Sequence, residues 1–313
     1  MILVTGASGY VGRHVVRRLA DVSPGDIRAM VRSARSYQAP AGVSVVEADL
    51  TRAASLPAAV QGADTIIHCA ALTADIKEPY HGAYDAINRV GTENLTAAAA
   101  SAGTRRLVVM SGLGTQPAPI HTYMATRWAM EEAVRRSGIA YVILRPSVQF
   151  GDGAEFVAAL ARLARQSPVV PLLGGGGLLF QPIWVEDVVT CIEKSVASEE
   201  LLNREITIGG SEQLSFKEII EAILKAMHTR RILAPLPLPL ARLGAGLMQV
   251  LPHPPLTPAS LELFGFDNIA TPDAVDREFG FHPRAFREYL EARGIEARPP
   301  IPEERHQDET PAP

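Results

Sequence analysis

The chain has 313 residues, of which 47% are hydrophobic and 20% charged, so it can bury the core of one large domain or of two unequal domains. Its formal net charge of -4 gives no general attraction for a phosphate backbone, which argues against a nucleic-acid-binding protein. No basic or apolar leader precedes the first predicted strand, so we expect a cytoplasmic protein. Cys69 and Cys191 lie far apart in apolar stretches, which predicts two buried free thiols rather than a disulfide or a metal site.

Short apolar runs alternate with longer segments of helical period through the first 150 residues. We predict strands at residues 2–5, 27–31, 43–47, 65–68, 107–111 and 141–144, and helices at residues 10–20, 83–102 and 123–136. Strands that alternate with helices in this order predict an α/β fold of the Rossmann type, which is a doubly wound parallel sheet with helices on both faces.

The pattern changes after Arg145 and Pro146, and we place a domain boundary near Gly151. Residues 151–297 are predicted to form a smaller α+β region that binds a substrate or a partner, with residues of about 181–195 returning to the first domain. Local signals in this region are a helix at 154–165, a glycine run at 174–177, a strand at 181–185 and a capping box from Ser215 to Glu218. Residues 298–313, rich in proline and glutamate, are predicted to be disordered.

Residues 232–251 are almost wholly apolar, but their first half carries three prolines and their second half carries Arg242. Prolines at this spacing exclude a regular membrane-spanning helix. Two interpretations are open. The segment is either an internal helix or lid over the cleft of the second region, or an interfacial patch that docks on a membrane or a partner.

The start of the chain carries an apolar run, three glycines spaced three residues apart, and then helical periodicity. Glycines between a strand and a helix let the backbone approach a pyrophosphate, and the N-terminal N–H groups of the helix point at it. A dinucleotide bound by residues 1–150 is therefore the first expected ligand. Its contacts in this turn are predicted to be Gly6, Ser8, Gly9, Tyr10, Val11 and Gly12.

The end of the second predicted strand carries Arg32, Ser33 and Arg35, where an NAD-preferring site would place a carboxylate against the adenosine ribose. A carboxylate there would repel a 2′-phosphate, whereas two guanidinium groups can donate charge-assisted hydrogen bonds to it. These residues therefore favour NADP(H) over NAD(H). The alternative is an ordinary basic surface loop.

Two further strand ends are predicted to contact the adenosine half of the dinucleotide. After the third strand, Asp49 can accept from the adenine amino group while Leu50 packs on the ring; the alternative is a turn carboxylate and a core leucine. After the fourth strand, the small side chains of Cys69, Ala70 and Ala71 leave room for the adenosine and pyrophosphate to cross the sheet edge. The histidine that precedes them is expected to be a hydrogen-bonded strand-end residue rather than a base.

Motifs within residues 1–230 resemble, in order, those of the short-chain dehydrogenase/reductase superfamily in its extended and atypical branches. They are Thr5 to Gly12, Ala48 to Leu50, His68 to Ala71, Asn88 to Asn94, Tyr123, Arg145 to Gly151 and Gln181 to Val188. The resemblance implies dinucleotide binding and adds Pro146 to the expected cofactor contacts. Further on, residues 252–257 and 261–269 resemble the NAD(P)H-binding accessory subunit of respiratory complex I and its stand-alone bacterial relatives.

The superfamily resemblance implies catalysis by a tyrosine, a lysine four residues later, and a serine or threonine that helps to hold the substrate oxygen. The matching residues are Tyr123 and Arg127, with Ser111 at the end of the fifth strand and Thr115 as an alternative hydroxyl. Residues four apart meet on one helix face, so the cation can lower the tyrosine pKa and hold the nicotinamide ribose. Arginine keeps the charge, but its planar fork has a different reach from an ammonium group. Asn88 is expected either to hold the backbone near this site or to be an exposed helix residue.

Three functions are consistent with these residues. The first is an NADP(H)-dependent oxidoreductase that reduces a carbonyl of a hydrophobic substrate, because the loop at 172–180 and the helix near Leu240 are largely apolar. The second is a non-catalytic nucleotide-binding accessory subunit that meets respiratory complex I or the inner face of a membrane through residues 232–251, which the arginine at position 127 favours. The third is a nucleotide-sugar epimerase or dehydratase, which the arginines after the second strand disfavour.

Overall fold

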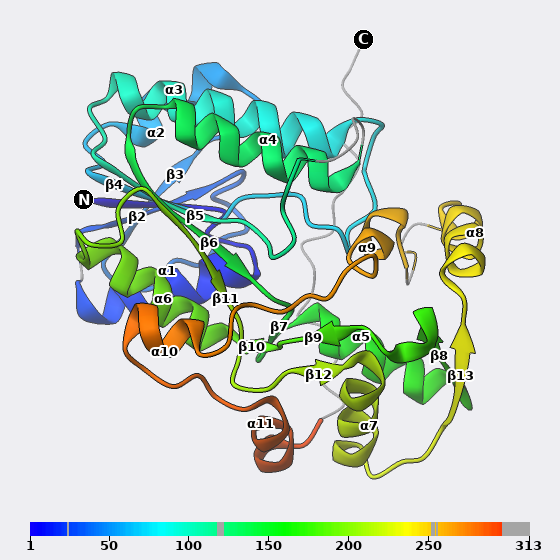
Figure 1. Cartoon of the computed structure of the whole chain (residues 1–313). Coiled ribbons are helices and arrows are strands. Elements are labelled where there is room, and N and C mark those ends of the chain that lie inside the picture. The colour runs from blue at the N-terminus through cyan, green and yellow to red at the C-terminus, as the bar shows by residue number, and fades with distance from the viewer. Residues whose placement is uncertain (24, 118–121, 252–253, 255, 296–313) are drawn as a thin grey trace.

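A sheet of seven parallel strands forms the centre of the N-terminal part of the chain in the computed structural model (Figure 1), which describes residues 1–23, 25–117, 122–251, 254 and 256–295. In spatial order the strands are β11 (Arg204–Ile208), β6 (Ala140–Pro146), β5 (Arg106–Met110), β4 (Thr65–His68), β1 (Ile2–Thr5), β2 (Ile27–Val31) and β3 (Val43–Glu47). All six pairings are parallel, which confirms the predicted doubly wound sheet. The predicted disordered tail, 298–313, lies outside the described residues.

The strand order reverses between β1 and β4. The chain moves outward from β1 through β2 to β3, and then crosses to the other side of β1 to form β4. In doubly wound sheets, ligands bind at the carboxyl ends of the strands at this switch point. The glycine turn that follows β1 and the small residues that follow β4 both lie there.

Helices cover both faces of the sheet, as Figure 1 shows. On one face lie α1 (Tyr10–Val22), α6 (Val185–Ala197) and α10 (Ala274–Phe279), and on the other lie α2 (Leu56–Val60), α3 (Gly91–Ser101) and α4 (Tyr123–Arg136). Alternate residues of a strand point to opposite faces, so Val4 and Ile67 belong to the core beside α1, and Leu3 and Ile66 to the core beside α4. Burial on both faces explains why these strands are continuous apolar runs in the sequence.

Most predicted elements are found within one or two residues of their expected ends, but two differ. The helix expected at 83–102 begins with a π-helical segment, η2 (Asp85–Val90), before it continues as α3. The strand expected at 181–185 is shortened to β10 (Ile183–Trp184), because Val185 already begins α6. A short 3-10 turn, η1 (Ala53–Ser55), precedes α2.

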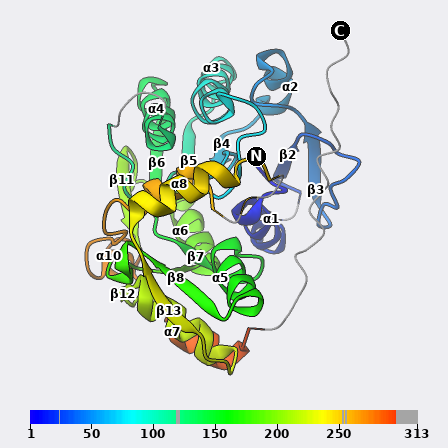
Figure 2. The ribbon, with the colours of Figure 1, turned by 90° about the vertical axis from the view of Figure 1, so that its right-hand side faces the viewer.

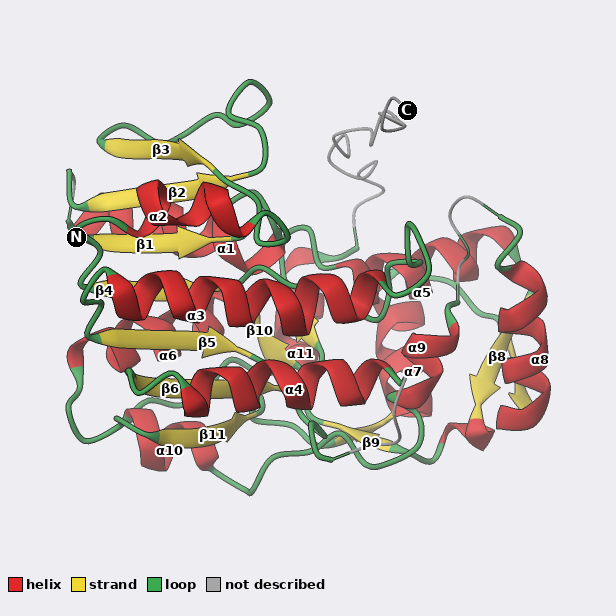
Figure 3. Cartoon of the chain, turned by 90° about the horizontal axis from the view of Figure 1, so that it is seen from above, coloured by secondary structure: helices red, strands yellow, loops and turns green. Residues whose placement is uncertain are grey.

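The remaining elements form a smaller lobe beyond the carboxyl ends of the strands (Figure 3). Its helices are α5 (Glu155–Gln166), η3 (Gly174–Gly176), α7 (Phe216–Ala226), α8 (Leu238–Met248), α9 (Pro258–Glu262) and α11 (Phe286–Arg293). Its strands pair as β10 with β7 (Gln149–Phe150), β12 (Leu214–Ser215) with β9 (Leu179–Phe180), and β13 (Ile232–Leu236) with β8 (Val169–Leu173). Its core contains Phe150, Phe180, Phe216, Phe264 and Phe286.

Two features of this lobe were expected from the sequence. The capping box is confirmed, because Ser215 Oγ accepts from Glu218 N at 3.2 Å and the Glu218 carboxylate accepts from Ser215 N at 2.9 Å. Residues 232–251 fold as β13 followed by α8, which packs by one side on the lobe and leaves the other in solvent. In the described part of the chain, no helix has the length and apolarity needed to cross a membrane.

Candidate cofactor and active site

A tight turn joins β1 to α1 at the switch point of the sheet. Gly6 has a φ of +65°, and a Cβ on it would lie 2.6 Å from the Ala70 nitrogen. A Cβ on Gly12 would lie 2.0 Å from the Gly6 oxygen, and Gly9 N donates to that same oxygen at 2.9 Å. Glycine is therefore required, and it brings the start of α1 directly against the end of β4. The first turn of α1 carries no acidic residue and its N-cap no side-chain hydrogen bond, so its N–H groups can bind an anion.

The other predicted residues of the turn contribute mainly through their backbone. Ser8 and Gly9 are exposed, and Val11 is partly buried. The Tyr10 ring packs edge-on against His14 at 5.6 Å between centroids, and its Oη is buried without a hydrogen-bond partner among the described residues. Burial accordingly raises the pKa of the Tyr10 phenol well above its ordinary value.

The end of β4 is fixed by side-chain hydrogen bonds beneath Cys69, Ala70 and Ala71. His68 Nδ1 contacts Thr5 Oγ1 at 2.7 Å, and its Nε2 contacts Thr92 Oγ1 at 3.0 Å. Burial, with a smaller contribution from the Arg127 charge, lowers the pKa of His68 to about 3. Because both ring nitrogens are engaged and the ring is neutral, His68 is the hydrogen-bonded strand-end residue that the sequence indicated.

The loop after β2 presents free positive charge. Arg32, Ser33 and Arg35 are all exposed, and neither guanidinium has a carboxylate partner among the described residues. Glu47, at the end of β3, holds the loop by accepting from Ala34 N at 3.0 Å. The loop is thus anchored by its backbone, and the two arginines are left to bind an anion from solvent.

Asp49 and Leu50 make local structural contacts. Asp49 Oδ1 accepts from both the backbone N and the Oγ1 of Thr51, each at 2.8 Å. Leu50 is 6% exposed and belongs to the core beside α4, and its carbonyl accepts from Asn94 Nδ2 at 2.9 Å. These contacts agree with the turn carboxylate and core leucine that were the alternative interpretation, and they leave the second carboxylate oxygen of Asp49 for a ligand.

Tyr123 and Arg127 lie one turn apart at the start of α4. Arg127 is 4% exposed, and its Nη2 donates to the carbonyl of Met110, the last residue of β5, at 2.9 Å. This bond places the arginine at the carboxyl edge of the sheet, one strand from β4. Its Nε is buried and has no hydrogen-bond partner among the described residues. A buried donor of this kind needs an acceptor, which a ribose hydroxyl would supply.

Burial and nearby charges shift the pKa of the Tyr123 phenol in opposite directions. Burial raises its pKa, while the Arg127 charge and a backbone hydrogen bond at Ala74 lower it. The charges of Asp75 and Glu262 raise it further, and the net shift is upward. Tyr123 therefore keeps its proton at neutral pH, as an acid must.

The two hydroxyls expected to assist Tyr123 are engaged elsewhere. Ser111 Oγ donates to Glu131 Oε1 at 2.6 Å, and Thr115 Oγ1 donates to the Gly112 carbonyl at 2.7 Å. Glu131 is fully buried on α4 and also accepts from Arg145 Nε at 2.9 Å. Their pairing could not be read from the sequence, because Glu131 comes from α4 and Arg145 from β6.

Asn88 and Pro146 complete the predicted set. Asn88 is fully buried, its side chain exchanges hydrogen bonds with both the N and O of Leu72, and its Nδ2 donates to Thr126 Oγ1 at 3.2 Å. Of the two interpretations of Asn88, the exposed helix residue is therefore wrong, and its amide holds backbone as the other expected, tying the loop after β4 to α4. Pro146 is buried at the end of β6, where its carbonyl accepts from Leu113 N at 2.9 Å.

A segment near the end of the described chain completes the surroundings of Tyr123. Glu262 of α9 accepts from the backbone N of Tyr123 at 3.0 Å and of Met124 at 3.1 Å, and so caps α4. The ring of Phe266 packs so closely on Gly114 that a Cβ there would lie 2.1 Å from it. Neither contact was expected, because about 140 residues separate the partners and no local motif marks them.

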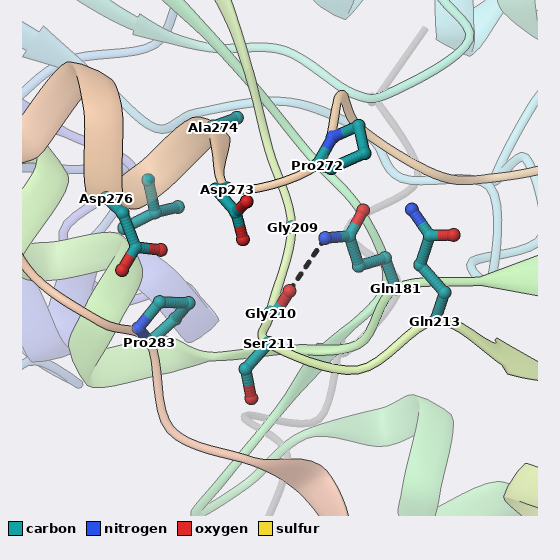
Figure 4. Close-up of a pocket in the computed structure, with 11 residues that line it drawn as sticks. Gln181, Gly209, Gly210, Ser211, Gln213, Pro272, Asp273, Ala274, Asp276 and Pro283 are labelled. Carbon is teal, nitrogen blue, oxygen red and sulfur yellow. Dashed lines mark hydrogen bonds between the residues drawn. The ribbon is translucent and has the colours of Figure 1, made fainter.

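A small cavity lies beyond the end of β11, apart from the residues described above (Figure 4). It has a volume of about 160 Å³, and its wall includes Gln181, whose Nε2 donates to the Gly210 carbonyl at 2.7 Å. β11 is the edge strand, four places from β1, so this cavity is separate from the glycine turn.

Comparison with known proteins agrees with this geometry. The sequence profile of a family described as NAD(P)H-binding matches residues 6–159. Residues 6–159 are therefore similar to the NAD(P)H-binding domains of that family. The profile begins at the first glycine of the turn and ends within α5, so it contains each of the predicted cofactor contacts.

Similar proteins include reductases. Over 175 residues the chain is 33% identical to a ceramide reductase of Caulobacter vibrioides, covering 55% of this chain and 54% of that protein. Over 319 residues it is 26% identical to a 2-alkyl-3-oxoalkanoate reductase of Stenotrophomonas maltophilia, covering 90% and 94%. Against several such relatives, the ceramide reductase among them, the match spans less than two thirds of the relative's length.

The fold is shared with solved structures. An NADPH-dependent quinone oxidoreductase of Escherichia coli, complexed with NADPH, superposes with a TM-score of 0.74 at 18% identity, over 93% of this chain and 99% of that one. Because the sequence identity is this low, the superposition shows a common fold and not a common activity. The link to the accessory subunit of complex I is not shown by these relatives and stays a prediction.

Proposed function

We propose that the chain is an NADP(H)-dependent reductase that delivers hydride to the carbonyl carbon of a hydrophobic substrate. The observation that carries this proposal is the start of α4, where Tyr123 lies one turn from a buried arginine with an unbonded Nε at the carboxyl edge of the sheet. The glycine turn and Arg127 Nε both fit a bound dinucleotide. The free arginines after β2 support the phosphorylated form, NADP(H), over NAD(H).

In this reaction Tyr123 and Arg127 have different roles. When bound, NADPH supplies the hydride to the carbonyl carbon. Tyr123 Oη donates its proton to the carbonyl oxygen, so that an alcohol forms, and the phenolate takes a proton back from solvent. Arg127 stabilises that phenolate by its charge and holds the ribose through Nε.

A hydrophobic substrate is supported by aromatic side chains near the start of α4 and the loop that follows β5. The Tyr84 ring packs edge-on against it at 5.3 Å between centroids, and Phe266 lies over the loop that follows β5. Two similar proteins are named for the reduction of ceramide and of a 2-alkyl-3-oxoalkanoate.

The second candidate is a non-catalytic nucleotide-binding accessory subunit. The arginine at position 127 and the commitment of the Ser111 hydroxyl to Glu131 favour it, because both depart from the usual catalytic set. An epimerase or dehydratase acting on a nucleotide sugar is disfavoured by the arginines after β2, since those reactions use retained NAD.

A turnover assay with a panel of long-chain aldehydes, ketones and quinones separates these candidates. We expect NADPH oxidation with at least one member, and a loss of about a hundredfold or more in kcat for Tyr123→Phe with unchanged NADPH affinity. Tyr80→Phe, on an exposed neighbouring tyrosine, is the control and should keep full activity. Activity that survives Tyr123→Phe contradicts the assignment, and NADPH binding without any turnover supports the accessory subunit.

A further inference from the structure

The outer side of α8 carries an apolar face. Leu240, Leu243 and Leu247 are 58%, 64% and 69% exposed, and Val250, just beyond the helix, is 86% exposed. Spacings of three and four residues put the leucines on one side of the helix, whereas Ala241 and Ala245 are buried against the lobe. Figure 2 shows α8 on the outer surface of the molecule, with β13 leading into it. Large apolar side chains grouped in this way mark a surface that contacts another body.

The apolar face continues onto the loop that follows β4. Lys77 Nζ donates to the Leu251 carbonyl at 3.2 Å, which joins the end of α8 to that loop. In the same loop Ile76 is 47% exposed and Tyr80 is 53% exposed. We call Ile76, Tyr80, Leu240, Leu243, Leu247, Val250 and Leu251 the leucine face.

The charge beside the leucine face is positive. No aspartate or glutamate occurs between Glu221 and Glu262, a stretch that carries Arg230, Arg231 and Arg242. None of these arginines has a carboxylate partner among the described residues. β13 and α8 contain no acidic residue, whereas the loop after β4 contains Asp75 and Glu78.

Part of this charge is gathered in a cavity. Arg165, Arg230 and Arg231 line a surface hollow of about 590 Å³ at the start of β13. Ile232, which is 66% exposed, lines the same hollow. Guanidinium groups beside an exposed apolar side chain match the anionic headgroup and acyl chain of a phospholipid.

We propose that the leucine face docks on the surface of a membrane that contains anionic phospholipid. The leucines would lie at the boundary of headgroups and acyl chains, and the arginines against phosphates. A second copy of the chain fits this face poorly, because a symmetric pair of α8 helices would bring their arginines together and α8 supplies no carboxylate. The proposal goes beyond the reductase and does not depend on it.

Flotation of the full chain with vesicles tests the proposal. We expect binding to vesicles of equal parts phosphatidylglycerol and phosphatidylcholine, and much weaker binding to phosphatidylcholine alone. Leu243→Ser/Leu247→Ser should reduce the bound fraction about tenfold or more, because two apolar anchors are lost. Arg230→Glu/Arg242→Glu, on two exposed arginines, should reduce it by a similar factor, and added salt should weaken binding by the wild type.

Val22→Ser is the matched control, because Val22 is 62% exposed at the end of α1, away from α8. It should float as the wild type does, and all variants should keep the wild-type melting temperature because the substituted side chains are largely solvent-exposed. Failure of the wild type to bind anionic vesicles overturns the proposal. Full binding by the leucine variant also overturns it, as does a dimer in sedimentation that the leucine substitutions dissociate.

Discussion

The turn after β1 and the start of α4 lie at the same edge of the sheet, but they are built in different ways. The turn depends on contacts within a few residues and on one neighbouring strand, such as the approach of Gly12 to the Gly6 carbonyl. The start of α4 is held by Glu262, which is about 140 residues away in sequence. The cofactor end of the site is therefore encoded locally, whereas the substrate end is assembled from distant segments.

We expect the largest change in stability and in NADPH affinity when the glycine turn is substituted. Gly12→Ala puts a Cβ 2.0 Å from a backbone oxygen that cannot move without shifting the turn. We expect a loss of about 3 kcal/mol or more in the free energy of unfolding, together with loss of NADPH binding. Urea unfolding and nucleotide titration measure both. Gly177→Ala, where a Cβ meets nothing within 4 Å, is the control. Unchanged stability and affinity in the Gly12 variant would show that the turn is not the constraint described here.

The next largest effect concerns Arg127, at the substrate end. Arg127→Met removes the charge that lowers the Tyr123 pKa, so kcat should fall about ten- to a hundredfold. In the alcohol-oxidation direction Tyr123 must act as a phenolate, so the rate should rise with pH into the alkaline range. In the methionine variant that rise should move to still higher pH.

Arg127→Lys supplies the matched comparison for this prediction, because it keeps the positive charge. Its alkaline rise should stay close to that of the wild type. A pH profile that is the same in the methionine and lysine variants would mean that the arginine acts only by packing.

We expect an intermediate effect on stability from His68, which ends β4 between the glycine turn and the start of α4. The pKa of its buried ring is about 3 in the folded chain, against 6.5 for a free imidazole, so below the latter value the unfolded chain binds the proton first. Stability is therefore present above pH 6.5 and is lost, at about 1.4 kcal/mol per pH unit, as pH falls toward 3.

Urea unfolding at pH 6.5 and 5.5 measures this loss in the wild type and in His68→Gln, which cannot titrate. The glutamine variant should lose about 1 kcal/mol less than the wild type between the two values, because the unfolded imidazole is already half protonated at pH 6.5. His282→Gln, on an exposed ring, is the control. Equal pH dependence in wild type and the His68 variant would show that His68 is not held neutral.

We expect the smallest effect on stability and activity from Glu262, which caps α4 from a distant part of the chain. Glu262→Ala removes the acceptor for two N–H groups of α4 and should cost about 1 kcal/mol of unfolding free energy. It also removes a charge that raises the Tyr123 pKa, so the alkaline rise of alcohol oxidation should move to lower pH. Glu200→Ala, on an exposed residue, should change neither quantity. A shift to higher pH would contradict the electrostatic role given to Glu262.

The difference between local and long-range contacts also explains which parts of the fold and site could be predicted from the sequence. Apolar runs and helical periods predicted the strands of the sheet and the position of α4, because burial on both faces leaves a direct pattern in the sequence. The glycine turn could be predicted for the same reason. Glu262 and Phe266 could not, because their partners are set by how the lobe folds back on the sheet.

At other positions the local sequence pattern could not choose between alternatives. Asn88 gave no sign of burial, since an asparagine on a helix is equally common in solvent. Ser111 fits a catalytic position by its place after β5, but its hydroxyl donates a hydrogen bond to Glu131 of α4, a partner that the sequence did not indicate. In residues 232–251 the composition indicated an apolar segment without showing which side of α8 would be exposed.

Isothermal titration with NADPH and NADH tests the central claim most directly, which is that the edge beside β1 and β2 binds the phosphorylated dinucleotide. We expect NADPH to bind about tenfold or more tightly than NADH, and Arg32→Ala/Arg35→Ala to remove that difference while leaving NADH affinity unchanged. Arg136→Ala, on an exposed arginine at the far end of α4, should leave the difference intact. Equal affinity of the wild type for the two dinucleotides, or failure to bind either, would contradict the claim.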